Sequence, residues 1–225
     1  MRTDKIQAVV FDVDGTLVDA FGDIAEAANA GLRALGLPEK PREEITKSVG
    51  YGSLRLVARV MGLPEDSPEV VECRQTFVAY YQEHAGEHAF LYPGARDLLS
   101  FLGKNGIRTA ALTNKPHELT IKTVEALGVN DLLDLIQGET EGFPLKPDPA
   151  GLLTICSRLG AKPENTIVVG DGDTDMDAAC AAGAIPWGVT YGMRTPEELV
   201  AHGAKSVFDS LAEVRKAIER LLKQQ

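Results

Sequence analysis

The sequence predicts an α/β fold with a doubly wound parallel sheet, interrupted by one insertion made only of helices. Short apolar runs alternate with amphipathic helical stretches over the later part of the chain, which is the pattern of βαβ units. One earlier segment shows helical periodicity and no strand-like run. The composition, 44% hydrophobic and 25% charged, can bury a sizeable core, and 225 residues fit one domain that carries an insertion.

Five apolar runs are short and mostly rich in β-branched residues, as expected of strands buried on both faces of a parallel sheet. The first run has Gln7 as its only polar interruption and ends directly before Asp12. The five predicted strands cover residues 6–11, 107–112, 132–136, 166–170 and 185–189.

Amphipathic helical stretches alternate with the later strands. Several begin with a proline in the first turn and stop near a glycine, which are common signals for the two ends of a helix. Because strands and helices alternate, we expect βαβ units and a parallel α/β sheet. The predicted helices cover residues 93–104, 116–127, 149–159, 173–182 and 196–202, with a closing surface helix over residues 211–222.

Residues 19–90 break this alternation. Apolar side chains between Phe21 and Leu35 recur on one helical face, and those between Leu54 and Met61 do the same. A further helix is expected over residues 69–83. The chain is therefore predicted to divide into an α/β core of residues 1–18 and 92–225 and an all-helical domain of residues 19–91.

Charge and cysteine content narrow the possible functions. The net charge of −10 disfavours binding to nucleic acid or to an anionic membrane through the overall field. The three cysteines lack a CxxC spacing, which supports neither a disulfide framework nor a zinc knuckle. No secretory leader pattern is recognised at the N-terminus, and no apolar run approaches the ~20 residues of a membrane span. We therefore expect a cytoplasmic protein.

Carboxylates, hydroxyls and lysines are concentrated directly after the predicted strands. Packing of the core does not explain this concentration of polar side chains. Ligands of doubly wound sheets bind beyond the carboxyl ends of the strands, so these residues form the candidate site. Each motif has a simpler interpretation when it is considered by itself. Thr113-Asn114 could only cap the following helix, and Lys146 could be a solvated surface charge. The candidate residues are Asp12, Asp14, Gly15 and Thr16 after the first strand, Thr113, Asn114 and Lys115 after the second, Lys146 before a helix, and Asp171 and Asp175 after the fourth.

Two metal-site patterns fit less well. The acids from Asp171 onward resemble a calcium loop, but Met176 and Ala182 stand where that loop needs glycine and glutamate. The segment of residues 84–88 matches an H-x-x-E-H zinc pattern, but Gly86 weakens the helix that would align the histidines. A third zinc ligand is also not evident. We therefore disfavour both a calcium loop and a zinc centre.

Taken together, the strand-end motifs resemble the phosphatase branch of the haloacid dehalogenase-like superfamily, and they occur in that family's order over nearly the whole chain. The resemblance implies a Rossmann-like core and identifies residues 19–91 as a helical cap domain. Within the superfamily, Thr113-Asn114-Lys115-Pro116, Gly138-Glu139 and Ala178-Ala179 look most like phosphoglycolate phosphatases. One departure is Gly172, where relatives usually carry serine or threonine.

The resemblance also implies residue roles. Asp12 would be the nucleophile and Asp14 the general acid and then base, with Lys146 as a further catalytic residue. It places Mg²⁺ on the Asp12 carboxylate, the Asp14 carbonyl and Asp171, with Asp175 nearby. The phosphoryl group would be held by Gly15, Thr16, Thr113, Asn114 and Lys146.

We therefore predict a Mg²⁺-dependent phosphomonoester hydrolase with an aspartyl-phosphate intermediate, acting on 2-phosphoglycolate or a similar small phosphorylated metabolite. A carboxylate that attacks a phosphate is repelled by its negative charge, and two unit charges 4 Å apart repel by about 1 kcal/mol even in water. A divalent cation such as Mg²⁺ would offset this repulsion. The alternatives are a β-phosphoglucomutase-like phosphomutase, or a phosphatase for sugar phosphates, nucleotides or pyrophosphate. A signalling receiver module is disfavoured, because it lacks a proton donor two residues after its phosphoacceptor. The chain is expected to be a monomer or a homodimer.

Substrate choice is predicted to come from the helical insertion, because only this part can close over the leaving group. Tyr51, Ser53 and Arg55 stand at a helix start within it and are predicted to face the active site. The alternative is that Ser53 only caps its helix and Arg55 is solvated.

Overall fold

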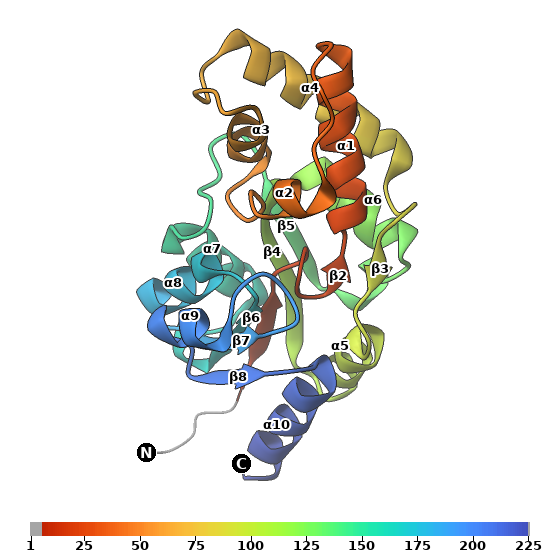
Figure 1. Cartoon of the computed structure of the whole chain (residues 1–225). Helices are drawn as coiled ribbons and strands as arrows, with labels where there is room; N and C mark the ends of the chain where they lie inside the picture. The colour runs from red at the N-terminus through yellow and green to blue at the C-terminus, as the bar shows by residue number, and fades with distance from the viewer. Residues whose placement is uncertain (1–5, 225) are drawn as a thin grey trace.

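The structure is a computed structural model that describes residues 6–224, and its core is a six-stranded parallel sheet with helices on both faces (Figure 1). The strand order β5-β4-β1-β6-β7-β8 places the first strand in the middle, so the chain winds outward in both directions from β1. The predicted fold class is confirmed. The strands are β1 (Ala8–Phe11), β4 (Arg108–Pro116), β5 (Leu135–Glu139), β6 (Thr166–Gly170), β7 (Ile185–Val189) and β8 (Ser206–Phe208).

The alternation of side chains along β1 divides the core into two layers. Ala8 and Val10 pack on one face of the sheet, and Val9 and Phe11 pack on the other. All four are buried, as expected for a central strand covered on both faces. The first face is covered by α7 (Pro149–Leu159) and α8 (Asp173–Ala182), and the second by α5 (Ala95–Lys104), α6 (His117–Ala126) and α10 (Leu211–Lys223).

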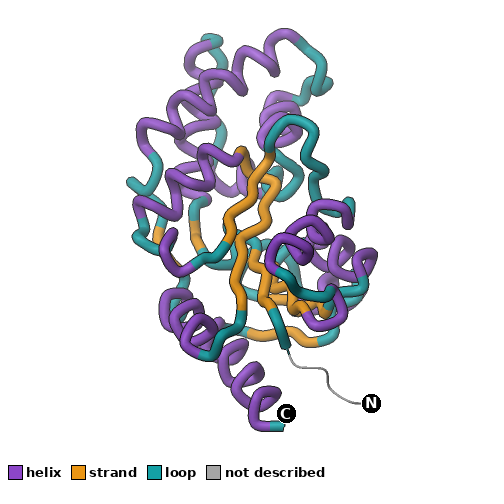
Figure 2. Tube along the Cα trace, turned by 180° about the vertical axis from the view of Figure 1, so that it is seen from behind, coloured by secondary structure: helices purple, strands orange, loops and turns teal. Residues whose placement is uncertain are grey.

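Four helices are inserted between the two short strands β2 and β3, which pair in antiparallel fashion. Figures 1 and 2 show these helices standing together beyond one end of the sheet. Among the helices of residues 6–224, none is both long and apolar enough to cross a bilayer. The inserted elements are β2 (Val18–Asp19), α1 (Phe21–Ala34), α2 (Arg42–Thr46), α3 (Ser53–Met61), α4 (Pro68–His84) and β3 (Phe90–Leu91).

The insertion is tied together by packing and by one buried carboxylate. Helices α1 and α4 make the most extensive helix–helix contact of the described chain. Asp23, in the first turn of α1, accepts hydrogen bonds of 2.7 Å from the backbone N–H groups of Gly86 and His88. The chain that leaves α4 is therefore held against the start of α1.

Several boundaries differ from the sequence prediction. Strand β4 continues past Leu112 to Pro116, so α6 begins at His117, one residue later than expected. Strand β5 begins at Leu135, because a single 3₁₀ turn occupies Asn130–Leu132. Strand β8, helix α2 and the β2–β3 pair were not predicted. These elements are two to five residues long, and such short segments carry too little periodicity to be recognised. The remaining helix, α9 (Pro196–Ala201), packs on β7 and β8.

Candidate active site

The loop after β1 presents Asp12 and Asp14 at the carboxyl end of the sheet. The N–H of Asp12, the first residue of this loop, donates to the Val169 carbonyl of β6 at 2.9 Å. The loop therefore begins beside the end of β6. Gly15 has a φ of +89°, and a Cβ there would collide with the Asp171 carboxylate. Glycine is therefore needed both for the turn and for the close approach of Asp171.

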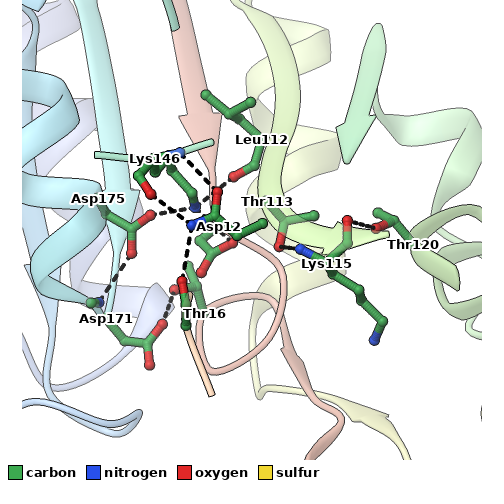
Figure 3. A network of polar contacts seen from close by, with 12 residues as sticks. Asp12, Thr16, Leu112, Thr113, Lys115, Thr120, Lys146, Asp171 and Asp175 are labelled. Atoms are coloured by element: carbon green, nitrogen blue, oxygen red, sulfur yellow. Dashed lines mark hydrogen bonds and ion pairs between the residues drawn. The ribbon is translucent and has the colours of Figure 1, made fainter. Parts of the chain in front are cut away.

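Three carboxylates meet beyond the ends of β1 and β6. Oxygen atoms of Asp12, Asp171 and Asp175 lie within 4.8 Å of one another (Figure 3). Burial raises the pKa values of Asp171 and Asp175, and repulsion from the neighbouring carboxylates adds to the effect. The Asp14 side chain points elsewhere, toward Lys115, so its carboxylate is not part of this cluster.

Neighbouring groups orient these carboxylates. Thr16 donates its hydroxyl to Asp171 at 2.8 Å, and the N–H of Met193 donates to the other oxygen of Asp171 at 2.9 Å. The N–H of Gly172 donates to Asp175 at 3.0 Å, so the backbone makes a contact here although this residue lacks a hydroxyl. Such contacts around a metal site fix its ligands in place.

The residues present fit a divalent cation. Asp12 Oδ1 is buried and has no hydrogen-bond donor, although the Lys146 ammonium lies 3.0 Å away, so this oxygen keeps capacity to bind a cation. Three hard oxygen donors suit Mg²⁺ or a similar ion. Within residues 6–224 this is the one cluster of this kind, and neither His84 nor His88 belongs to it.

The Lys146 ammonium lies between the carboxylates of Asp12 and Asp175. Its Nζ lies 3.0 Å from Asp12 Oδ1 and 2.5 Å from Asp175 Oδ1, and it donates to the Leu112 carbonyl at 2.8 Å. Burial opposes the charge of Lys146, but Asp12 and Asp175 outweigh this effect and raise its pKa. The lysine therefore remains charged beside the proposed nucleophile.

Asn114 holds the loop of Lys146 in place. Its side-chain amide donates to the Lys146 carbonyl and accepts from the Lys146 N–H, both at 2.8 Å. It also donates to the Gly50 carbonyl of the insertion at 3.0 Å. The side chain of Asn114 is therefore committed to positioning this loop and the segment of Gly50. Thr113 is buried nearby and lines the same pocket.

A second buried lysine, Lys115, faces Asp14; the sequence analysis placed this lysine at the candidate site but assigned it no role. Lys115 donates to Asp14 Oδ1 at 3.0 Å and to the Tyr81 hydroxyl at 2.5 Å, with its Nζ 4.3 Å from the centre of the Tyr81 ring. Burial raises the pKa of Asp14, Lys115 lowers it and Asp12 raises it, with a net increase. Only the position of Lys115 beside Thr113 hinted at this role, and Tyr81 comes from α4 of the insertion.

The three predicted residues of the insertion take different positions. Ser53 lines the pocket and accepts a hydrogen bond of 2.8 Å from Arg74, so it does not act as a helix cap. Tyr51 donates to Asp173, at the start of α8. Arg55 is half exposed and pairs with Glu65 at 3.0 Å. The structure thus brings Ser53 into the pocket and Tyr51 to its rim, and it leaves Arg55 outside.

Asp173 joins the insertion to the core. It accepts from Tyr51 and also from Arg194, whose guanidinium lies 3.2 Å away. Burial alone would raise the pKa of Asp173, but the hydrogen bonds from Tyr51 and Arg194 lower it below the ordinary value. At the rim of the pocket, the ionised Asp173 carboxylate therefore links Tyr51 of the insertion to Arg194 of the core.

The pocket has a polar floor and an apolar wall. Core loops supply the floor, and helices of the insertion supply most of the wall. This combination is typical of a site for a small ligand. Among the lining residues, Asp12, Asp14, Thr113, Lys115 and Asp171 are polar, and Ile24, Val49, Leu56, Phe77 and Leu119 are apolar.

Comparison with known proteins agrees with this geometry. A phosphoglycolate phosphatase of Chromobacterium violaceum is 38% identical over 95% of this chain and 97% of its own length. An N-acetylmuramic acid 6-phosphate phosphatase of Pseudomonas aeruginosa is 34% identical over 99% of both chains. The crystal structure of a predicted phosphoglycolate phosphatase from Haemophilus somnus superposes with a TM-score of 0.85 at 27% identity, covering 95% of this chain and 98% of that one.

The family model for the haloacid dehalogenase-like hydrolases matches residues 6–183, which include every motif of the pocket floor. This match agrees with the fold and with the enzymes to which the chain is similar. The chain therefore belongs to the haloacid dehalogenase-like hydrolase family, and it is a phosphatase of that family.

Proposed function

We propose that this protein is a Mg²⁺-dependent phosphomonoester hydrolase that forms an aspartyl-phosphate on Asp12. The observation that carries the proposal is the Asp12 carboxylate, which lines the pocket with one buried oxygen free of hydrogen bonds and Lys146 3.0 Å away. Bound at Asp12, Asp171 and Asp175, Mg²⁺ would supply the positive charge that offsets repulsion between a carboxylate and a phosphate.

In the first half-reaction, an oxygen of Asp12 attacks phosphorus and the bond to the leaving oxygen breaks. Lys146 and Thr113 hold the phosphoryl oxygens. The N–H of Gly15, for which the sequence predicted the same role, donates instead to the Val18 carbonyl at 2.8 Å. The leaving alkoxide takes the proton of Asp14, and the raised pKa of Asp14 favours its protonated form. In the second half-reaction, Asp14 accepts a proton from the water that attacks phosphorus, which releases inorganic phosphate and restores Asp12.

Residues 19–91 act as a cap in this proposal. The hydrogen bonds from Asn114 to the Gly50 carbonyl and from Tyr51 to Asp173 connect the insertion to the core around the pocket. Helices α1, α3 and α4 supply the apolar wall, so they exclude water while the phosphoryl group is transferred. Ser53 would contribute to substrate choice from this side.

The relatives suggest two candidate substrates. One is 2-phosphoglycolate, from the relative of 38% identity, and the other is N-acetylmuramic acid 6-phosphate, from the relative of 34% identity. We propose the smaller of the two, or a similar small phosphorylated metabolite. A panel of phosphomonoesters ranked by kcat/KM tests this choice, with phosphate release as the readout. Isomerised sugar phosphate without phosphate release would instead indicate a phosphomutase.

The Asp14→Asn variant is expected to lose activity unevenly. For an alkyl phosphate, whose leaving group needs a proton, we expect kcat to fall by about 10²- to 10⁴-fold. For p-nitrophenyl phosphate, whose leaving group needs none, the loss should be at least tenfold smaller. Steady-state rates on both substrates provide the comparison, and an equal loss on both would remove Asp14 from the role of general acid.

Stability without metal should depend on pH. The folded state raises the pKa values of Asp171 and Asp175 above 3.8, so it binds more protons than the unfolded chain. Their contribution to stability is therefore complete at low pH and is lost as the pH rises through the raised pKa values.

Mg²⁺ should counteract this loss, because a metal ion binds the deprotonated carboxylates. At 100 times its Kd, the ion should add about 2.7 kcal/mol at about pH 8 and less at about pH 5. Thermal unfolding with Mg²⁺ and with EDTA at both pH values measures this difference. Asp171→Asn should abolish the Mg²⁺ effect, whereas an unchanged melting temperature in the unmodified protein would contradict the metal site.

A further inference from the structure

The two buried lysines of the pocket have different partners. Lys146 contacts two carboxylates and a carbonyl, whereas Lys115 contacts one carboxylate, that of Asp14, and the hydroxyl of Tyr81. Figure 3 shows the side chain of Lys115 extending away from Asp12 and Lys146. Lys115 therefore belongs to a different part of the pocket from the group of residues proposed to hold the phosphoryl group.

That part of the pocket is where the leaving group lies in the proposed reaction. Asp14 must contact the leaving oxygen to protonate it, and Lys115 Nζ is 3.0 Å from Asp14 Oδ1. A substituent two bonds beyond the leaving oxygen therefore comes within reach of Lys115. The ammonium group has three N–H donors. Asp14 and Tyr81 accept from Lys115, and no other acceptor within residues 6–224 hydrogen-bonds to its Nζ.

The surrounding wall offers no comparable partner for a negative charge. The pocket that Lys115 lines has apolar side chains from α1, α3, α4 and α6 in its wall. Arg194 also lines the pocket, but its guanidinium is paired with Asp173, which in turn is held by Tyr51. Because an ion pair is stronger away from water, a buried ammonium with a donor to spare favours an anionic group on the leaving side.

We propose that Lys115 is a specificity-determining residue that binds a carboxylate on the carbon next to the phosphoester oxygen. The substrate class is then phosphate esters of 2-hydroxycarboxylic acids, rather than neutral alcohols or sugars. This inference rests on the proposed phosphatase function, and it adds the side chain that selects substrates by the charge of the leaving group. The apolar wall limits the rest of that leaving group to a small one.

Lys115 has a simpler alternative role, which is to hold Asp14 in position. Loss of that role would slow all substrates with poor leaving groups alike. Loss of a carboxylate contact would slow only substrates that carry the carboxylate. The ratio of kcat/KM for 2-phosphoglycolate to that for its neutral amide, 2-phosphoglycolamide, therefore separates the two roles.

The experiment measures this ratio in the unmodified protein and in Lys115→Met, Lys115→Gln and the control Lys122→Met, which removes an exposed lysine of α6. We expect the unmodified protein and the control to prefer the acid by about 10- to 100-fold, the value of a charged hydrogen bond. Both Lys115 variants should reduce the preference to about threefold or less. The glutamine variant keeps donors for Asp14 and Tyr81, so it serves if the methionine variant does not fold.

Equal rates on acid and amide in the unmodified protein would overturn the proposal without any variant. A preference that survives in either folded Lys115 variant would overturn it as well. Failure of the unmodified protein to release phosphate from any phosphomonoester would instead refute the proposed function, so the two failures are distinguishable.

Discussion

The Asp12→Asn variant is expected to lose at least about 10⁴-fold in kcat on any phosphomonoester, because an amide oxygen is too weak a nucleophile to form the phosphoryl ester. The fold should persist, since the substitution removes one of three mutually repelling carboxylates and keeps the shape of the side chain. Steady-state rates and thermal unfolding of the same preparation measure both effects. Mass spectrometry during turnover should detect a phosphoryl group on residue 12 of the unmodified protein only.

The matched control is Asp131→Asn, which makes the same chemical change at an exposed position in the 3₁₀ turn before β5. It should retain nearly full activity. Normal turnover by Asp12→Asn would exclude Asp12 as the nucleophile. It would also exclude the two-step reaction, which depends on this carboxylate.

The Lys146→Met variant is expected to lose both activity and stability. Lys146 is 6% exposed, and its removal leaves the carboxylates of Asp12 and Asp175 without their cation. Breaking a buried ion pair by removing one partner costs about 3–5 kcal/mol, because the other charge stays buried. Urea unfolding in EDTA measures this loss. Mg²⁺ should recover part of it, because the ion compensates the same carboxylates.

Lys162→Met is the control for this experiment, since Lys162 is exposed and precedes the turn before β6. Its free energy of unfolding should change by less than about 0.5 kcal/mol. If Lys146→Met unfolds at the same urea concentration as the unmodified protein, Lys146 does not compensate the carboxylate cluster in the way that the distances imply.

The sequence predicted the meeting of Asp12, Asp171 and Asp175 because of a general property of parallel sheets. Each residue follows a strand, and the carboxyl ends of parallel strands lie at the same edge. Strands β1 and β6 are in fact neighbours, with Phe11 opposite Val169. The order of the motifs along the chain was therefore enough to place the cluster and to assign the family, even where the boundaries of β4 and β5 were shifted.

The Lys115–Asp14 contact shows where sequence reasoning stopped. In an isolated sequence, a lysine after a strand is most often a solvated charge, and nothing local indicates that it is buried. Its burial depends on Tyr81, which is 34 positions earlier in the chain and reaches the core only because α4 packs over α6. The same holds for Tyr51 and Asp173, which come together across 122 positions.

Local patterns in the amino-acid sequence determined the longer strands and helices and the residues that follow each of these strands, because backbone periodicity and turn chemistry act over a few neighbouring residues. Tertiary structure alone decided which side chains of the insertion line the pocket: Ser53 is inside it and Arg55 is outside, although both lie in the first turn of α3. It also decided which lysine pairs with which aspartate. These contacts depend on how two separately patterned parts of the chain pack together, and burial and pairing follow from that packing.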